Sequence, residues 1–213
     1  MSPRSIGVAI LACAIGGPLW AQKESAAEWK PLFDGSSLAG WRETAFTGHG
    51  KVSVESGAIV LGKGILTGIT RTAAFPKFNY EVRLEAMRVE GYDFFAGITF
   101  PVHDSFCSWI NGGWGGMVVG LSSLDDMDAA ENDTSIRRSF QSGRWYRLRL
   151  RVTEDRIQAW IDDEAVIDAY IATRMVGLRE GEIEMSTPFG IASYSTTAKL
   201  RKLEYRLLAP GGN

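Results

Sequence analysis

The pair His103-Asp104 is the clearest candidate in this sequence for proton transfer. A neutral imidazole can accept a proton near pH 7, and a neighbouring carboxylate can assist it. The one other histidine, His49, lies between two glycines in a turn. Because His103-Asp104 stands between two apolar runs, a hairpin turn with a polar tip is the alternative interpretation.

An acidic segment, residues 125–133, carries five carboxylates. Calcium takes oxygen ligands from loops of this kind, which makes Asp125, Asp126 and Asp128 candidate calcium ligands. Asp126 and Glu131 are also candidate catalytic acids that could complement the histidine. The segment lacks the spacing and the central glycine of an EF-hand, so a solvated acidic loop is the alternative. Calcium is the one cofactor considered, because no zinc-ligand pattern, phosphate loop or dinucleotide fingerprint occurs in the sequence.

A glycine-rich stretch, residues 111–116, places four glycines around Trp114. Such a loop can present an indole as a platform for a sugar ring, since sugar rings stack their apolar faces on aromatic side chains. Asn111, Gly113 and Trp109 are the accompanying substrate-binding candidates. The alternative is a turn in which Trp114 caps the core. Because the glycines leave open space beside the indole, we expect Trp114 to be partly exposed at the rim of a ligand-facing sheet.

Strands are the elements that must position these side chains. Apolar and charged residues alternate over residues 145–152 and over residues 80–86 of the expected strand 78–89, which is the two-residue period of a half-buried strand. Residues 52–61 read as a hairpin around Glu55-Ser56-Gly57, and a second hairpin crosses residues 162–164. Further strands are expected over residues 94–102, 106–111, 117–121, 156–161, 165–170, 189–194 and 200–207. No segment shows a long apolar stripe at helical spacing, and the best helical candidate is residues 125–132, so the pattern predicts an all-β, two-sheet sandwich.

Three arginines, at positions 147, 149 and 151, form a ladder along one face of the strand over residues 145–152. We interpret this ladder as a solvated outer sheet face, with a binding surface as the alternative. Cys107 lies in an aromatic run and is expected to be a small buried hydrophobic residue.

Composition and charge bound the class of protein. The 213 residues are 45% hydrophobic and 23% charged, which suits one domain with a sizeable core. The net charge of −2 and the lack of a basic stripe argue against nucleic acid as a partner. Oligomeric state is left open by the sequence.

The N-terminus reads as an export signal over residues 1–21. Arg4 precedes an apolar run over residues 6–15, and Ala21 offers a small residue for cleavage. The run is too short for a transmembrane span. We therefore expect a periplasmic or extracellular protein, with flexible residues 22–28 and one domain over residues 29–208. A lipid anchor on Cys13, which follows Ile10-Leu11-Ala12, is the alternative.

The opening of the domain resembles a known family. The run Pro31-Leu32-Phe33-Asp34-Gly35-Ser36-Ser37-Leu38-Ala39-Gly40-Trp41 is similar to the start of the 3-keto-disaccharide hydrolase domains, and similar blocks follow at residues 78–85, 143–148 and 160–168. The resemblance implies a concanavalin A-like jelly-roll sandwich and a saccharide ligand. The opening itself reads as structural, because Asp34-Gly35 can form a tight turn that tucks the flanking apolar side chains into the sandwich.

The chain is a divergent member by this resemblance. Typical members carry a Gln-Asp-His stretch before the final strand, whereas residues 190–197 contain no histidine or carboxylate. Typical members also place an acidic residue on the strand that here spans residues 106–110. The family's catalytic residues are therefore not carried over to these positions.

Two functions remain open: hydrolysis or lyase cleavage of 3-keto-disaccharides or glycosides, and non-catalytic carbohydrate binding or interaction at the cell surface. Ordinary glycosidases need two carboxylates about 5–10 Å apart, and the nearest acidic string, residues 182–184, lacks the third acid of sandwich glycosidases. A 3-keto sugar needs less, because its ketone acidifies the neighbouring C–H bond, so one base and one enolate stabiliser suffice. Convergence of His103, Trp114 and the acidic segment in one pocket would favour an enzyme, and their separation would favour a binding module.

Overall fold

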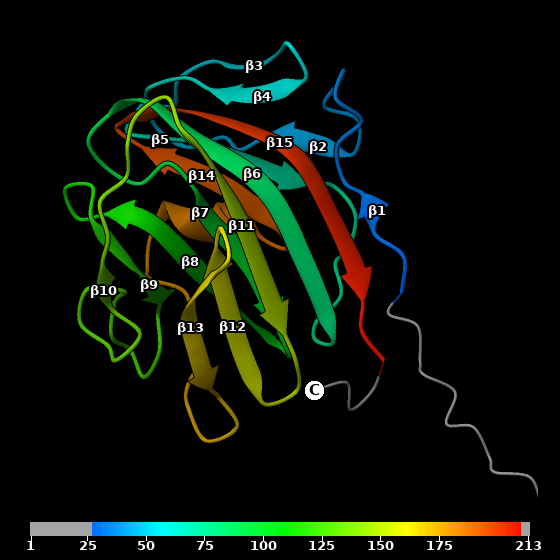
Figure 1. Cartoon of the computed structure of the whole chain (residues 1–213), viewed down its shortest axis with the longest axis vertical. Helices are drawn as coiled ribbons and strands as arrows, with labels where there is room; N and C mark the ends of the chain where they lie inside the picture. The colour runs from blue at the N-terminus through cyan, green and yellow to red at the C-terminus, as the bar shows by residue number, and fades with distance from the viewer. Residues whose placement is uncertain (1–26, 210–213) are drawn as a thin grey trace, which may run out of the picture.

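The computed structural model describes residues 27–209 and shows two antiparallel sheets packed face to face (Figure 1). The prediction of an all-β, two-sheet sandwich is confirmed. Within the described residues, the one helical element is a short 3-10 helix, η1 (Glu182–Ser186). No helix in this part of the chain is long and apolar enough to cross a membrane. The expected signal peptide over residues 1–21, with Cys13 inside it, and residues 22–26 lie outside the described range.

The first sheet has eight strands. Its order is β13-β12-β11-β6-β15-β4-β3, and β1 also pairs with β15. These strands are β1 (Lys30–Pro31), β3 (Val52–Glu55), β4 (Ala58–Leu61), β6 (Tyr80–Gly91), β11 (Trp145–Val152), β12 (Arg156–Ile161), β13 (Glu164–Tyr170) and β15 (Thr196–Leu207).

The second sheet has seven strands, in the order β10-β9-β8-β7-β14-β5-β2. These strands are β2 (Trp41–Glu43), β5 (Leu66–Arg71), β7 (Gly97–Val102), β8 (Ser105–Gly113), β9 (Val118–Ser122), β10 (Ile136–Arg137) and β14 (Gly190–Tyr194). A long connection, residues 171–189, leaves the edge strand β13 of the first sheet and enters β14 inside the second sheet.

The core lies between the two sheets and follows from side-chain alternation. On β6, Tyr80, Val82 and Leu84 are buried, and on β11 Leu148 lies opposite Leu84 in the pairing register. Because successive side chains of a strand point to opposite faces, the charged residues between them must face outward. The second sheet contributes its own buried inward row, which includes Ile98, Phe100, Trp109, Leu121 and Ile191.

The hairpins predicted from turn residues are confirmed at β3–β4 and at β12–β13. The best helical candidate, residues 125–132, forms turns instead of a helix. The opening motif is structural, as expected. Asp34 accepts hydrogen bonds from the backbone N–H groups of Ser36 and Ser37, both at 2.7 Å, and Trp41 donates its indole N–H to the Leu32 carbonyl at 2.7 Å. The hydrogen bonds from Ser37 and Ser36 hold the pKa of Asp34 well below its usual range.

Candidate functional site

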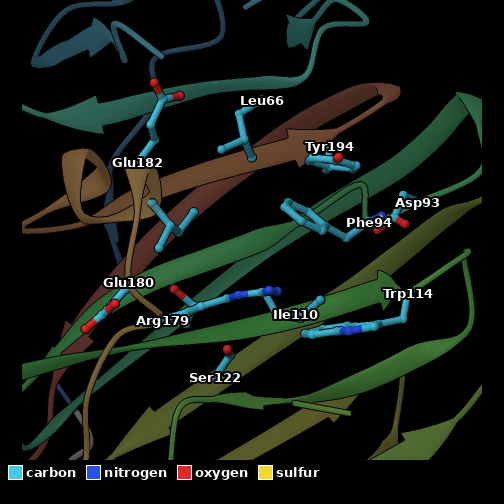
Figure 2. A pocket seen from close by; sticks show the side chains of 12 residues that line it. Leu66, Asp93, Phe94, Ile110, Trp114, Ser122, Arg179, Glu180, Glu182 and Tyr194 are labelled. Atoms are coloured by element: carbon cyan, nitrogen blue, oxygen red, sulfur yellow. Dashed lines mark hydrogen bonds between the residues drawn. The ribbon is translucent and has the colours of Figure 1, made fainter. Parts of the chain in front are cut away.

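A cleft of about 410 Å³ opens on the outer face of the seven-stranded sheet (Figure 2). Strands β5, β8, β9 and β14 supply its floor and one wall, and the connection over residues 171–189 supplies another wall. The lining residues are Leu66, Asp93, Phe94, Ser108, Ile110, Trp114, Ser122, Arg179, Glu180, Glu182, Ile183 and Tyr194.

Glycines on the outer face of the seven-stranded sheet allow other segments to pack directly against it. These covering segments form the borders of the cleft. A Cβ atom added to Gly68 would come within 2.9 Å of the Phe46 ring, and one added to Gly190 would come within 2.6 Å of the Ser186 carbonyl oxygen. A larger residue at either position would therefore push the covering segment away. The cleft is the part of the face that these segments leave open.

A buried guanidinium from the eight-stranded sheet holds the loop that carries Trp114. Arg88, on β6, donates hydrogen bonds to the carbonyls of Gly112 at 3.4 Å and Gly116 at 3.1 Å. Burial lowers the pKa of Arg88, and the nearby Asp93 carboxylate partly opposes that change. The loop is thus bound on both sides of the tryptophan.

Asp93 fastens the same loop from the rim of the cleft. Its carboxylate accepts the backbone N–H of Phe94 at 2.8 Å and that of Gly115 at 2.9 Å. Charge-assisted hydrogen bonds of this kind are stronger than neutral ones. The carboxylate is therefore a structural anchor that fixes the position of the indole.

Aromatic side chains line the open part of the cleft. Trp114 has 41% and Tyr194 38% of its surface exposed, and the rings of Phe94 and Tyr194 lie 5.9 Å apart between centroids. The expected partial exposure of Trp114 is confirmed. An exposed indole over a cleft is available for stacking, because its face is not covered by the core.

The wall opposite these aromatics carries three charged residues. Figure 2 shows the Arg179 side chain reaching across the cleft toward Trp114, whereas the carboxylates of Glu180 and Glu182 point away from that guanidinium. The Arg179 guanidinium carbon lies 5.9 Å from the Trp114 ring centroid, and a guanidinium nitrogen lies 3.5 Å from the Asp128 carboxylate. The Glu182 carboxylate accepts the backbone N–H of Thr47 at 2.9 Å. The central polar group of the cleft is thus a hydrogen-bond donor.

His103 and Asp104 do not line this cleft. They form the turn between β7 and β8, where a ring nitrogen of His103 lies 2.7 Å from the Glu154 carbonyl oxygen. Asp104 is highly exposed, and a hydrogen bond from Lys77 lowers the pKa of its carboxyl. His103 and Asp104 therefore lie in a hairpin turn with a polar tip and do not converge with Trp114 in one pocket.

Carboxylates of the acidic segment, residues 125–133, form ion pairs and hydrogen bonds within turns. The pKa of Asp125 is lowered by a hydrogen bond from the Met175 backbone N–H and by Arg174. Asp128 accepts the Ser122 hydroxyl, and Glu131 accepts the Asp128 backbone N–H.

Asp126 is exposed on the same turn, at a positive φ of 60°. Between residues 27 and 209 no three His, Cys, Asp or Glu side chains gather in a metal-binding group. The expected calcium ligands, Asp125, Asp126 and Asp128, are therefore not brought together, and neither Asp126 nor Glu131 lines the cleft.

Three of the predicted substrate-binding neighbours face away from solvent. Trp109 is fully buried in the core, and Asn111 is fully buried with its amide donating to the Ala96 carbonyl at 3.0 Å. Gly113 is also buried, and a Cβ atom there would meet the Ile110 side chain at 2.7 Å. The alternation of β8 explains this correction, because Trp109 and Asn111 share its inward face. Cys107 shares it too, and burial raises the pKa of its thiol to about 12, as expected for an inert core residue.

Sequence reasoning missed most of the cleft. Arg179 and Glu180 lie in an irregular connection with no motif, and Phe94 and Tyr194 come from opposite halves of the chain. Glu182 belongs to the acidic string at residues 182–184, but only the fold shows that it lines a cleft. The one usable signal was the cluster of glycines around Trp114.

Solved structures similar to this chain share the two-sheet fold. The Crh5 transglycosylase in complex with NAG has a TM-score of 0.56 at 16% identity, over 86% of this chain and 85% of that chain. The carbohydrate-binding module CBM66 from Bacillus subtilis has a TM-score of 0.52 at 16% identity, over 78% of this chain and 95% of that chain. Domain 4 of AbnA, a GH43 extracellular arabinanase from Geobacillus stearothermophilus, in complex with arabinotriose, has a TM-score of 0.52 at 13% identity, over 80% and 83%.

The fold is thus a two-sheet sandwich of the concanavalin A-like kind. A family model assigns the chain more narrowly. Residues 28–206 match the 3-keto-alpha-glucoside-1,2-lyase-like domain, and the chain belongs to that family. The resemblance drawn from the opening motif is therefore confirmed. A search of proteins with curated functions found no match.

Proposed function

We propose that the cleft on the seven-stranded sheet binds a saccharide through Trp114, Tyr194 and Arg179. The observation that carries this proposal is the placement of two exposed aromatic rings around one guanidinium in a single cleft. Aromatic faces stack on the apolar faces of sugar rings, and a guanidinium donates hydrogen bonds to sugar hydroxyl or keto oxygens. Family membership favours a 3-keto-glycoside, or the oligosaccharide from which it derives, as the ligand.

Binding without turnover is the function that this geometry favours. His103 is separate from the cleft, and Asp93 and Glu182 both accept backbone hydrogen bonds that fix the loops. Acid–base catalysis needs a titrating group within hydrogen-bond reach of the proton it moves. The carboxylates that line this cleft point toward its edges instead of toward Arg179 (Figure 2).

A lyase or hydrolase of 3-keto-glycosides is the second candidate, and the family match favours it. In such a reaction a base removes the proton from the carbon next to the ketone, and the glycosidic oxygen then leaves with its bond electrons. In this cleft Glu180 and Glu182 are the available bases, and Arg179 is the available stabiliser of the enolate. This activity requires one carboxylate to turn inward when the substrate binds.

A calorimetric and product-release screen against oligosaccharides and their 3-keto forms tests both candidates. Trp114→Ala should weaken saccharide binding by about 1–3 kcal/mol, the scale of burying a large apolar side chain. Folding should change little, because the indole is 41% exposed. Ile65→Ala, which removes another exposed apolar side chain that does not line the cleft, is the matched control.

Product release that disappears in Glu180→Gln or Glu182→Gln would establish the enzyme. Binding without product release would establish the module. Unchanged saccharide affinity in Trp114→Ala would refute the cleft as the binding site.

Export from the cytoplasm belongs to the same proposal and rests on residues 1–21. The apolar run that follows Arg4 is typical of a secretory signal. We expect the mature protein to begin at residue 22, and N-terminal sequencing of the protein from its producing cells checks this. A lipid-modified N-terminus at Cys13 would contradict it.

A further inference from the structure

The outer face of the eight-stranded sheet carries more positive than negative charge. Six cationic side chains there share three carboxylates. Glu81 pairs with Arg149, Arg151 and Arg206; Glu85 pairs with Arg201 and Lys202; and Glu204 pairs with Arg83. We call these nine residues the arginine face. Its net charge is positive although the whole chain carries −2.

Two of the three carboxylates of the arginine face, Glu81 and Glu85, are less exposed than all six cations, whereas Glu204 is 29% exposed. The Glu81 side chain has 0% of its surface exposed and that of Glu85 has 15%, whereas Arg83 has 47% and Lys202 has 64% exposed. A ligand approaching from solvent therefore meets the positive groups first. Because a carboxylate that is shared by several cations cannot neutralise all of them, the outermost layer attracts anions.

Indole rings hold four of the guanidiniums in place. Arg149 lies 3.7 Å from the Trp160 ring centroid, and Arg201 lies 4.0 Å from that of Trp145. Arg83 and Arg206 both lie over Trp29, at 4.2 Å and 4.7 Å. Stacking restricts the flexible arginine side chains before any ligand arrives, so a ligand that binds them incurs less entropy loss.

Guanidiniums of the arginine face also keep donors for an outside partner. Arg83, Arg149 and Arg151 each donate one hydrogen bond to these carboxylates, out of about five N–H groups per guanidinium. The planar fork of an arginine matches the two oxygens of a carboxylate. The arginines stand on adjacent antiparallel strands, since Arg149 pairs with Arg83 and Glu204 also pairs with Arg83 in the sheet register. The donors thus spread across a sheet surface instead of converging in a pocket.

We infer that the arginine face binds an acidic polysaccharide, a polymer that carries carboxylates on successive sugar units. Charge complementarity selects an anionic polymer, and the spread of fixed guanidiniums across three strands fits an extended chain. This site lies on the opposite sheet from the cleft and does not depend on the function proposed for it.

Affinity electrophoresis in gels that contain polygalacturonate tests the inference. The wild-type protein should be retarded by polygalacturonate, should be released by added salt, and should migrate freely through the fully methyl-esterified polymer, whose carboxyl groups are uncharged esters. The double variant Arg83→Gln/Lys202→Gln removes two exposed cations at little cost to folding. It should bind about thirtyfold more weakly, since each of the two cations contributes ~1 kcal/mol near an anionic surface.

Two controls test whether the retardation comes from the arginine face, from the net charge of the protein or from the cleft. Lys51→Gln/Lys63→Gln makes the same change in net charge at exposed lysines outside the arginine face and should leave the retardation unchanged. Trp114→Ala should also leave it unchanged.

Equal binding by the Arg83/Lys202 variant, equal binding to the methyl-esterified polymer, or no retardation of the wild type would each overturn the inference. The same electrophoresis is also run in the presence of duplex DNA of comparable charge. Tighter binding to DNA than to polygalacturonate would replace the polysaccharide with a nucleic acid as the partner.

Discussion

At the scale of single residues, Arg88 explains why glycines surround Trp114. A Cβ atom at Gly112 would lie 2.5 Å from the Arg88 guanidinium, and Gly112 and Gly116 both have positive φ, at 81° and 105°. Glycine adopts this conformation without steric cost, whereas other residues do so with strain. The glycines that suggested a ligand platform therefore also make room for the buried group that holds the platform.

Replacing Arg88 with methionine should loosen the loop of residues 112–116. The change leaves the Gly112 and Gly116 carbonyls without this donor, and an unsatisfied buried polar group costs about 1–3 kcal/mol. Hydrogen exchange measured by mass spectrometry should show faster exchange over residues 112–116, and saccharide binding should weaken. Arg88→Lys, which keeps the charge and a donor, is the control. Unchanged exchange in Arg88→Met would show that Arg88 does not hold the loop.

At the scale of elements, the connection over residues 171–189 forms the charged wall of the cleft and depends on a few anchors. The backbones of Ser123 and Gly177 exchange two hydrogen bonds, at 2.8 Å and 3.1 Å. Arg174 binds both Asp125 and Asp133, and these carboxylates offset the effect of its burial and raise its pKa. The position of Arg179 in the cleft is thus set by contacts several residues away from it.

Acid should release this connection before the sandwich unfolds. The folded-state pKa of Asp125 lies below its ordinary value of 3.8. The ionised carboxylate therefore stabilises the folded connection fully above pH 3.8, and this stabilisation is lost as the pH falls below 3.8 and the carboxylate becomes protonated. We expect hydrogen exchange over residues 172–180 to accelerate below about pH 4 while exchange in β6 and β11 stays slow. Asp125→Asn should show fast exchange in this connection already at neutral pH. Simultaneous acceleration in the connection and in β6 would contradict this order of events.

At the scale of the whole molecule, Glu81 ties the centre of the eight-stranded sheet together. Its carboxylate on β6 receives Arg149 and Arg151 from β11 and Arg206 from β15, and its side chain is completely buried. These strands are the two hydrogen-bonded neighbours of β6. Removing one member of a buried charge cluster is costly because the other charges stay partly desolvated.

Glu81→Gln should destabilise the protein by about 3–5 kcal/mol, the range for breaking a buried ion pair. Urea unfolding followed by tryptophan fluorescence measures this as a lower midpoint with an unchanged slope. Glu90→Gln, at an exposed position of the same strand, is the matched control and should change stability by less than about 0.5 kcal/mol. Equal stability of the two variants would show that water solvates the three guanidiniums as well as the Glu81 carboxylate does.

Strands that have one buried face can be predicted directly from the amino-acid sequence. In β11, and in β6 from Tyr80 to Ala86, every second side chain is apolar, and this period alone assigns both the strand and its inward face. The hairpins at β3–β4 and β12–β13 were equally readable, because their turns and their strands are adjacent in the chain. The opening motif identified the family for the same reason, since its signal lies within eleven consecutive residues.

The candidate site, in contrast, depends on how distant segments of the chain pack together. The cleft joins β5, β8, β9 and β14 with an irregular connection, and these segments meet because β14 inserts between β5 and β7. Side chains that line this cleft are up to 128 positions apart in the sequence, from Leu66 to Tyr194. No short sequence motif can therefore predict that they lie together. His103 and Trp114 are near in sequence yet lie at opposite ends of β8, because an extended strand carries its two ends apart by about 3.3 Å per residue.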